Sequence, residues 1–292
     1  MCIRDSNICS LDLSKAFDKV NHFGLYIKLM KRLIPVELLE TLENWLSDCF
    51  AFVKWYNSHS SAFGIRFGVR QGSVLSPYLF SVYIDDVGKL CDSRNGQFVL
   101  LYADDILIIT LSVSALQDLV TAYEKILLGL DMSLNVGKSC CIRIGSRHDK
   151  ICNNIVTLNG LQLSWVNELR YLGIFIVSAC CFKISLDHAK CSFFRAINAV
   201  FGKVGRIASE EVVIELLKVK CLPILLYSLE VCNLNKRNLQ SLDFTVNRFF
   251  MKLFNTNNMN IVSQCQLSFS FELSSVILPK RLIKFESVML DR

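Results

Sequence analysis

The chain has 292 residues, of which 52% are hydrophobic and 20% are charged. This length allows one large domain or two ordinary ones, and the apolar content argues against an intrinsically disordered chain. The formal net charge of +6 arises entirely in residues 151–292, which hold 16 Lys and Arg against 10 Asp and Glu, whereas residues 1–150 hold 16 of each. Such a basic half suggests a polyanionic partner, although ordinary solvated helix faces would give the same count.

The cysteines and the apolar segments argue against several classes of protein. None of the 13 cysteines forms a C-x-x-C pair, which argues against a zinc ribbon or knuckle. The first residues, MCIRDSNICSLDLSKAF, lack the basic and then apolar layout of a secretory signal. The longest apolar segment, residues 98–116, contains two aspartates that together cost about 5–7 kcal/mol inside a membrane, more than its Leu and Ile side chains gain there. We therefore expect reduced thiols and a protein of the nucleus or cytoplasm, neither secreted nor membrane-spanning.

The first 180 residues alternate between strand-like and helix-like patterns. A strand over residues 7–13 ends near Asp12, and Ser14 is placed to cap a helix that Pro35 ends. A glycine-bearing loop, FGVRQGSV, leads into a further helix over residues 76–90. Other helices are predicted over residues 36–50 and 112–130, and other strands over 51–65 (a pair around a turn at 57–61), 98–110 (a pair), 139–144 and 155–158.

After residue 180 the pattern becomes mostly helical. The periodicity predicts helices over residues 186–204, 210–222 and 238–254. Basic side chains lie among the apolar positions of this region, namely Arg195, Lys203, Arg206, Lys218, Arg248 and Lys252. The chain as a whole is predicted to be α+β first and mostly α afterwards, with a boundary near residue 180.

Two adjacent aspartates, Asp104 and Asp105, interrupt the apolar stretch VLLYADDILIIT. A hairpin would place both at the turn between two buried strands, and a plain turn is the simplest interpretation because Asp favours turns. A tight hairpin, however, prefers Gly or Asn at one of the two positions, and neither is present. A bound Mg²⁺ would explain the clustered carboxylates, with Asp12 in SLDLSKAFD as the third ligand. Such a trio can hold two metals roughly 3.5–4 Å apart, which activate a 3′-hydroxyl and stabilise a leaving pyrophosphate.

A P-loop nucleotide site is the competing interpretation of an apolar strand that ends in two aspartates. The tripeptide GKS does occur, at residues 137–139. A P-loop also needs a glycine five positions before Gly137, and residue 132 is Met. The spacing therefore argues against this class.

Five motifs follow one another along the chain: LDLSKAFDKVNH, GVRQGSVLSPYLF, YADD, a GL…N…K stretch and YLG. In this order, over residues 9–175, they resemble the reverse transcriptase of non-LTR (LINE-type) retrotransposons. The resemblance implies an α+β right-hand polymerase, with a palm of antiparallel sheet and packed helices over residues 9–178 and a helical thumb-like region over 179–292. Only 11 residues precede Asp12, so the fingers are expected to be largely absent. Residues 1–8, beginning MCIRDS, are expected to be an artefactual or truncated start.

The resemblance also implies a catalytic centre. Asp12, Asp104 and Asp105 would be the catalytic aspartates and would hold two Mg²⁺ ions, or Mn²⁺ in their place, with help from the backbone carbonyl of Leu13. Asp12 and Asp104 would bridge the two metals. Phe17 matches the aromatic steric gate that selects deoxynucleotides, although its predicted helix would equally use it as a core residue.

The remaining motif residues would bind nucleotide and primer. Gln71 and Gly72 match the motif that lets the backbone approach the incoming nucleotide, and Lys138 matches the lysine that approaches the departing pyrophosphate and protonates it. Arg70 either reaches a phosphate or is an ordinary surface arginine. The resemblance further implies a primer-grip hairpin, which would bind the template and primer through Tyr171, Leu172 and Gly173.

Two functional interpretations follow from these residues. The first is an RNA-directed DNA polymerase whose partners are an RNA template, a DNA primer and deoxynucleoside triphosphates. The second is a catalytically inactive retroelement fragment that only binds nucleic acid through its basic helices. A maturase-like splicing cofactor would carry a basic domain after the thumb, and the sequence offers no sign of one.

Overall fold

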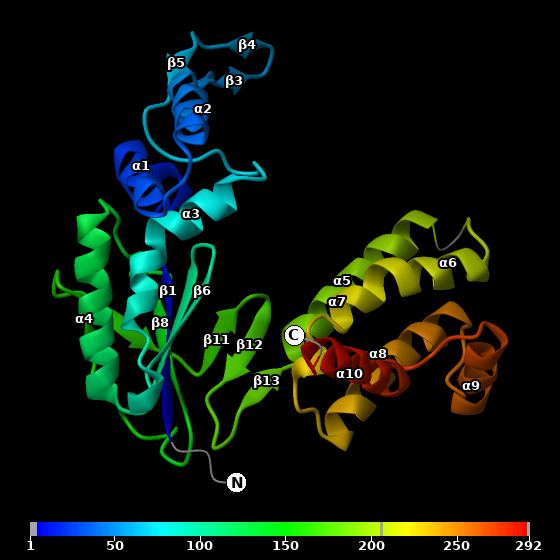
Figure 1. The fold of residues 1–292 in the computed structure, drawn as a ribbon. Helices are drawn as coiled ribbons and strands as arrows, with labels where there is room; N and C mark the ends of the chain where they lie inside the picture. The colour runs from blue at the N-terminus through cyan, green and yellow to red at the C-terminus, as the bar shows by residue number, and fades with distance from the viewer. Residues whose placement is uncertain (1–4, 205–206, 291–292) are drawn as a thin grey trace. The chain divides into compact units, whose positions relative to one another are not determined.

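The computed structural model describes residues 5–204 and 207–290, which form two compact units (Figure 1). The first unit extends to Leu172 and includes Val177–Phe182, and the second comprises Gly173–Ile176 and the chain from Lys183 onward. Residues 1–4 of the expected artefactual start lie outside the described residues, as does Arg206 of the predicted basic helices.

The first unit is built on a six-stranded sheet in the order β6-β7-β1-β8-β10-β9. Its strands are β1 (Ser6–Asp12), β6 (Phe98–Tyr102), β7 (Asp105–Thr110), β8 (Cys140–Ile144), β9 (Ile155–Val156) and β10 (Gln162–Trp165). The prediction of an antiparallel sheet is wrong for one pair, because β10 lies parallel to β8. The central strands β1 and β7 are mostly buried, and β7 is rich in Ile and Leu, whereas β6 is an edge strand with exposed positions.

Helices pack on this sheet to form the core of the first unit. Three of these elements are α3 (Ser76–Ile84), the 3-10 helix η2 (Asp85–Leu90) and α4 (Val113–Gly129). The short 3-10 helix η3 (Ser93–Asn95), which has no buried residue, lies in the connection to β6. The apolar faces of α3 and α4 meet the buried side chains of β1 and β7 in one cluster. Its largest buried side chains include Phe80 and Tyr83 from α3 and Tyr123 from α4. Burial of this apolar surface is what fixes the strand ends that carry the aspartates.

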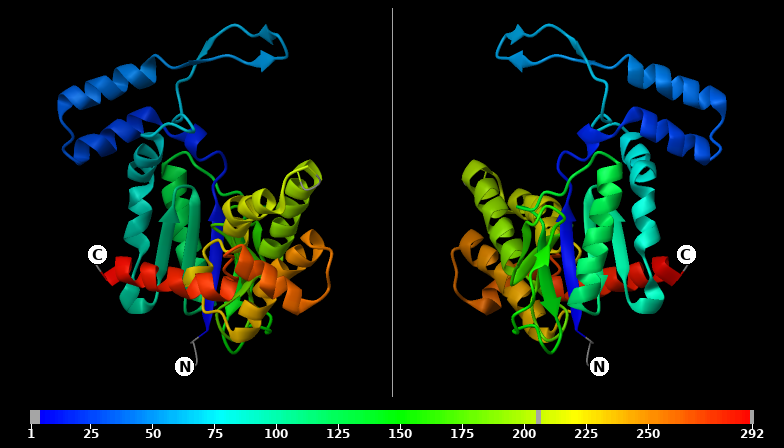
Figure 2. Two further views of the ribbon diagram at one scale, coloured as in Figure 1. Left: turned by 90° about the vertical axis from the view of Figure 1, so that its right-hand side faces the viewer. Right: turned by 90° about the vertical axis from the view of Figure 1, so that its left-hand side faces the viewer.

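An arm of short elements extends away from the sheet, as both views of Figure 2 show. It consists of α1 (His22–Lys31), α2 (Val36–Ser47) and two small strand pairs, β2 (Phe50–Ala51) with β5 (Phe63–Gly64) and β3 (Lys54–Trp55) with β4 (Ser58–His59). The turn between β3 and β4 lies at Tyr56 and Asn57, so the turn predicted at residues 57–61 is wrong. Tyr56 adopts a positive φ of 51° there, although tyrosine is not a residue that favours such a turn.

The helix after β1 begins later than predicted. Phe17–Lys19 forms a short 3-10 helix (η1), and α1 begins at His22, where the side chain of Asn21 accepts hydrogen bonds from the N–H groups of Phe23 and Gly24 at 3.0 and 3.3 Å. Ser14 is therefore not a helix cap. Its N–H instead donates to the carbonyl of Ser133 at 3.0 Å, and residues 14–16 form a turn at this point.

The chain passes to the second unit through a three-stranded sheet in the order β11-β12-β13, which the sequence did not predict as a sheet. Its strands are β11 (Glu168–Tyr171), β12 (Ile174–Val177) and β13 (Lys183–Ser185). Leu172 and Gly173 form the turn between the first two strands, and both have positive φ, of 45° and 83°. This conformation matches the two-residue hairpin turns that suit the twist of strands.

The second unit is helical. It comprises α5 (Asp187–Val204), α6 (Glu210–Leu216), a π-helical segment η4 (Leu217–Cys221), α7 (Leu222–Leu225), the 3-10 helix η5 (Leu229–Val231), α8 (Lys236–Leu253), α9 (Met259–Ser268) and α10 (Ser274–Leu290). Its own core contains Phe193, Leu217, Leu242 and Phe250. The predicted continuous helix over residues 210–222 is interrupted by the π segment, and the predicted helix over 76–90 is α-helical only to Ile84. Within the described residues, no helix combines the length and apolarity needed to cross a membrane.

Candidate active site

The three predicted aspartates lie at adjoining ends of the two central strands. Asp12, the last residue of β1, is directly opposite Asp105, the first residue of β7, in the antiparallel ladder. Residues opposed in this way have Cβ atoms roughly 4.5–5.5 Å apart, and like charges there are destabilising. Asp104 precedes Asp105 in the turn that joins β6 to β7.

The turn differs from the predicted one in its position. Tyr102 pairs with Asp105, so the two turn residues are Ala103 and Asp104 rather than the two aspartates. Ala103 has a positive φ of 52°, a conformation that glycine adopts more easily. The turn therefore forms against the usual residue preference, and the pairing of β6 with β7 on either side holds it closed.

The electrostatics of this cluster are unfavourable. Partial burial raises the pKa of Asp105, and the negative charges of Asp104 and Asp12 raise it further. The positive charge of Arg170 on β11 opposes this rise without cancelling it. Each neighbour that raises this pKa must lie close enough to repel the Asp105 carboxylate, so the three aspartates form one like-charge group.

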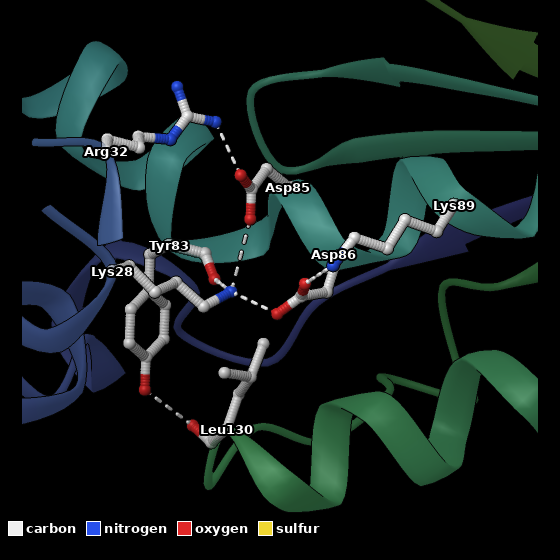
Figure 3. Close-up of polar contacts among 7 residues, drawn as sticks. All are labelled: Lys28, Arg32, Tyr83, Asp85, Asp86, Lys89 and Leu130. Atoms are coloured by element: carbon white, nitrogen blue, oxygen red, sulfur yellow. Dashed lines mark hydrogen bonds and ion pairs between the residues drawn. The ribbon is translucent and has the colours of Figure 1, made fainter.

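A second pair of adjacent aspartates in the chain shows the opposite arrangement (Figure 3). Asp85 accepts from Arg32 at 2.5 Å, and Asp86 pairs with Lys28 at 2.8 Å and with Lys89 at 2.5 Å. Hydrogen bonds from Lys28 and then Lys89 lower the pKa of Asp86 to about 2. This pair is neutralised by protein cations and serves structure, whereas the YADD pair retains net negative charge of the kind that attracts a cation.

The backbone of Asp12 is held by the segment that carries Lys138. The Asn135 N–H donates to the Asp12 carbonyl at 2.9 Å, and the Asp12 N–H donates to the Ser139 hydroxyl at 3.0 Å. Leu13 forms a bridge with Leu134 in the same stretch. Lys138 lies in the turn between Asn135 and Ser139, and its Nζ is 3.9 Å from the Asp12 carboxylate. Ser139 was missed as a site residue, because its contact with the Asp12 backbone joins segments 127 residues apart.

Phe17 and the glycine-bearing loop are joined by backbone hydrogen bonds. The Val69 N–H donates to the Phe17 carbonyl at 2.8 Å, so the loop that carries Gln71 is anchored beside Phe17. The Phe17 ring is only partly buried and stacks on Phe80, with ring centroids 4.7 Å apart. Its ring thus packs against the core, and a role at the sugar would have to use the part that remains exposed.

The glycine-bearing loop is open beyond that anchor. Arg70, Gln71 and Gly72 are all exposed. Gly72 has a φ of 85°, and a Cβ built there would meet no atom within 4 Å. Glycine is thus required at this position by its backbone conformation, and the space beside it is free for a ligand. Gln71 and Arg70 also line a cavity of about 650 Å³ at the base of the arm.

The predicted primer-grip residues are only partly connected to the aspartates. Tyr171, at the end of β11, is half-buried; burial raises its pKa, and the charge of Asp105 raises it further. Tyr171 therefore lies within electrostatic reach of the aspartate cluster. Arg170, the other residue that acts on Asp105, was missed, because an exposed arginine in an unpredicted strand carried no signal.

The described residues contain no group of three or more His, Cys, Asp and Glu side chains arranged closely enough to hold a metal ion. The chemistry of the cluster nevertheless fits a hard divalent cation, because all of its side-chain donors are carboxylate oxygens. Repulsion among them, expressed in the raised pKa of Asp105, is what a bound cation would relieve.

Residues 4–176 match the family described as "Reverse transcriptase (RNA-dependent DNA polymerase)". The chain belongs to the reverse transcriptase family. It is 28% identical over 242 residues to the "RNA-directed DNA polymerase from mobile element jockey" of Drosophila funebris, a match that covers 78% of this chain and 26% of that protein. The jockey protein of Drosophila melanogaster is 31% identical over 174 residues, covering 56% of this chain and 19% of the relative.

A retroelement of a third species extends the comparison. The type-1 retrotransposable element R2 Pol polyprotein of Popillia japonica is 25% identical over 269 residues, covering 86% of this chain and 43% of that protein. This chain thus spans about a quarter of the length of the jockey protein and less than half of the length of the R2 protein. The predicted relationship to reverse transcriptases of non-LTR retrotransposons is confirmed.

A solved structure supports the fold. Apo telomerase from Candida tropicalis matches with a TM-score of 0.53 at 14% sequence identity, covering 91% of this chain and 42% of that one. At this identity the likeness speaks for the fold alone. The predicted α+β class, a sheet with packed helices followed by C-terminal helices, is confirmed.

Proposed function

We propose that this reverse transcriptase is an RNA-directed DNA polymerase, which adds deoxynucleotides to the 3′-hydroxyl of a primer paired with an RNA template. One observation carries the proposal. Asp12 and Asp105 are opposed in the ladder with Asp104 in the adjoining turn, and the resulting like-charge cluster lies at the YADD motif of a reverse transcriptase family member.

The aspartates are the residues that would hold the metal. Asp12, Asp104 and Asp105 would hold two Mg²⁺ ions with help from the Leu13 carbonyl, and Mn²⁺ suits the same oxygen donors. When bound, the ions activate the primer hydroxyl and neutralise charge on the leaving pyrophosphate. The protein contributes a partly buried site in which the backbones of Asp12 and Asp105 are held opposite each other by strand pairing.

The residues around the aspartates would select and orient the nucleotide. Gly72 leaves open space beside Gln71 for the incoming base and sugar, and Phe17 is anchored to the same loop through Val69. Lys138 holds a proton on Nζ beside Asp12, from which it would protonate the departing pyrophosphate. Arg70 is exposed next to Gln71 and would contact a phosphate.

The hairpin and the second unit would bind the nucleic acid. Tyr171, Leu172 and Gly173 at the β11–β12 turn would position the primer end. In the second unit, Arg248 and Lys252 lie one helical turn apart on α8, beside a cavity of about 340 Å³. Cations at this spacing would contact successive phosphates without reading sequence.

The decisive experiment is primer extension on an RNA template with Mg²⁺ and deoxynucleoside triphosphates. The Asp104→Ala, Asp105→Ala double variant should lose extension, whereas Asp118→Ala, an exposed aspartate on α4, should retain it. If the unaltered protein extends nothing but binds the duplex in a salt-dependent way, the chain is a nucleic-acid-binding fragment and the proposal fails.

A further inference from the structure

Tyr83, at the end of α3, is almost completely buried, with 2% of its surface exposed. Its hydroxyl donates to the carbonyl of Leu130, which ends α4, at 3.0 Å (Figure 3). The backbone of Asn21, the capping residue of α1, lies close enough to the Tyr83 hydroxyl to oppose the rise in the Tyr83 pKa that burial causes. A single hydroxyl thus connects α1, α3 and α4.

Lys28 of α1 binds to the same residue from the other side (Figure 3). Its Nζ is 2.5 Å from the Tyr83 carbonyl and 2.8 Å from the Asp86 carboxylate, and 14% of its side chain is exposed. Gly24 lets α1 pack closely here, because a Cβ at this residue would lie 3.2 Å from the Tyr83 ring. The α1 helix is therefore seated on Tyr83 by a charge, by a hydrogen bond and by close packing.

Leu130, whose carbonyl accepts a hydrogen bond from the Tyr83 hydroxyl, is the C-cap residue of α4 and directly precedes the segment that carries Lys138. After Leu130 the chain turns through Asp131, which has a φ of 56°, and then follows β1. Over that segment Ser133 accepts from Ser14, and the Asn135 N–H donates to the Asp12 carbonyl. Because the Lys138 side chain is 72% exposed, little but its backbone fixes its place beside Asp12.

We propose that Tyr83 is a positioning residue for the active site, which fixes residues 131–139 and so places Lys138 against Asp12. The proposal rests on the function proposed above for those two residues. The last carbonyls of a helix have no hydrogen-bond donor within that helix, and the Tyr83 hydroxyl supplies a donor to the end of α4. Tyr83 itself lies on α3 and contacts α1, so this bond ties the end of α4 to both helices. Loss of that hydroxyl loosens the end of α4 and the segment after it, which then depend on their remaining bonds, such as that of the Met132 N–H to the Leu127 carbonyl at 2.9 Å.

Tyr83→Phe tests the coupling, because it removes one oxygen and keeps the ring in the core. Hydrogen–deuterium exchange should become roughly five- to tenfold faster at the amides of residues 131–139 and of Ser14. Tyr78→Phe on the same helix is the matched control, since Tyr78 is 56% exposed, and it should leave these rates unchanged. Unchanged exchange in a folded Tyr83→Phe protein overturns the proposal.

A second variant protects the test against misfolding. Lys28→Met removes the other tie between α1 and Tyr83 and should raise exchange in the same peptides, and the absence of any effect there counts against the proposal. In the extension assay, Tyr83→Phe should lower kcat about tenfold with an unchanged KM for nucleotide, because the loop that carries Gln71 is untouched. A rise in KM alone would contradict a role through Lys138. If the unaltered protein proves inactive, the proposed function fails while the exchange rates still decide the coupling.

Discussion

At the scale of single residues, Asp105 occupies a position where its own charge is unfavourable. Its pKa is raised by burial and by the charges of Asp104 and Asp12, so the folded protein binds this proton more tightly than the unfolded chain does. Ionisation of Asp105 consequently lowers the free energy of unfolding. This stability is lost as pH rises from the pKa of the unfolded chain through the pKa of the folded protein. Sites that trade stability for chemistry show this pattern.

We predict that Asp105→Asn raises the melting temperature of the first unit at pH 7 while abolishing extension. The amide is nearly isosteric and removes the repulsion, and a gain of about 1 kcal/mol corresponds to about 2–4 °C. Mg²⁺ should raise the melting temperature of the unaltered protein and have less effect on the variant. Differential scanning calorimetry with and without MgCl₂ measures both effects, with Asp118→Asn as the control. A variant that melts lower than the unaltered protein would contradict the electrostatic argument.

The ion pairs of Lys28 predict the opposite pH dependence. Lys28 and Lys89 lower the pKa of Asp86 to about 2, and although burial acts against it, Arg32 and Lys28 hold the pKa of Asp85 below its usual range. Depressed carboxyl pKa values contribute stability that is present above the unfolded pKa, about 3.9, and is lost as pH falls toward the folded value.

Lys28→Met should therefore destabilise the protein at pH 5–7 by about 1–2 kcal/mol, a figure reduced for the partly exposed carboxylates. The difference from the unaltered protein should shrink as pH falls from 4 toward 2. Lys89→Met is the matched control, because the Lys89 side chain is 77% exposed and a surface pair contributes little. Urea unfolding at several pH values checks the trend, and a difference independent of pH would point to packing rather than charge.

The residue scale is also where sequence was most informative. Spacing and residue type predicted Asp12 as the third carboxylate, and the structure places it opposite Asp105. The roles of Ser139 and Arg170 could not be predicted, because a hydroxyl that accepts from a backbone N–H and a charge acting across strands leave no pattern in the sequence. Such contacts arise only when distant segments meet.

At the scale of elements, tertiary hydrogen bonds outweighed local preference in the segment after β1. Helical spacing extends back to Phe17, and Ser14 is a good cap. The bonds of Asp12 and Ser14 to residues 133–135 instead hold residues 14–16 in a turn, in which Lys15 has a φ of 52°. The helix can begin only where Asn21 supplies a cap. Periodicity predicted the helix, and partners more than 100 residues away decided where it starts.

Two glycines of the loop before α3 should respond differently to substitution. Gly68 and Gly72 both have positive φ, but a Cβ at Gly68 would lie 2.9 Å from backbone atoms of Asp18, whereas one at Gly72 meets nothing. Gly68→Ala should therefore cost roughly 2–4 kcal/mol of stability, and Gly72→Ala about 1 kcal/mol for its backbone conformation alone. Urea unfolding distinguishes the two.

The milder substitution for stability, Gly72→Ala, should be the one that impairs nucleotide binding directly. Gly72→Ala protein should remain folded under assay conditions yet show a raised KM for deoxynucleotides, because the new methyl group enters the space proposed for the nucleotide. Steady-state single-nucleotide incorporation measures this. An unchanged KM in a folded Gly72→Ala protein would remove Gly72 and its open space from the proposed nucleotide site.

At the scale of the whole molecule, the sequence predicted the order of helical and strand-containing regions better than it predicted which strands pair. The α+β class and the helical second half followed from periodicity. The parallel pairing of β8 with β10 did not, since a four-residue strand carries little signal and its paired residues in β8 lie 24 positions earlier. The short strands β11 to β13 were missed for the same reason, although a YLG hairpin was expected from the resemblance.

The uneven charge of the chain leads to a prediction about nucleic-acid binding. The net excess of positive charge lies in residues 151–292. Within the second unit, Arg248 lies over the ring of Phe194 at 5.8 Å, and Lys252 lies over Phe201 at 4.9 Å. Aromatic rings hold both cations on the surface of α8 at a fixed spacing, which lowers the entropy lost when phosphates bind.

Arg248→Gln with Lys252→Gln should thus weaken binding to an RNA–DNA duplex uniformly across sequences, and the slope of log affinity against log salt should fall in magnitude by roughly 2. Fluorescence anisotropy at several salt concentrations measures the slope. The control changes Lys236 and Arg237, at the other end of α8, to Gln, which removes the same charge from exposed positions away from the cavity. An equal loss of slope in both double variants would mean that net charge alone binds the duplex. A change confined to Arg248 and Lys252 would mean that α8 offers a defined phosphate-binding surface, since only the placement of the charges differs between the two proteins.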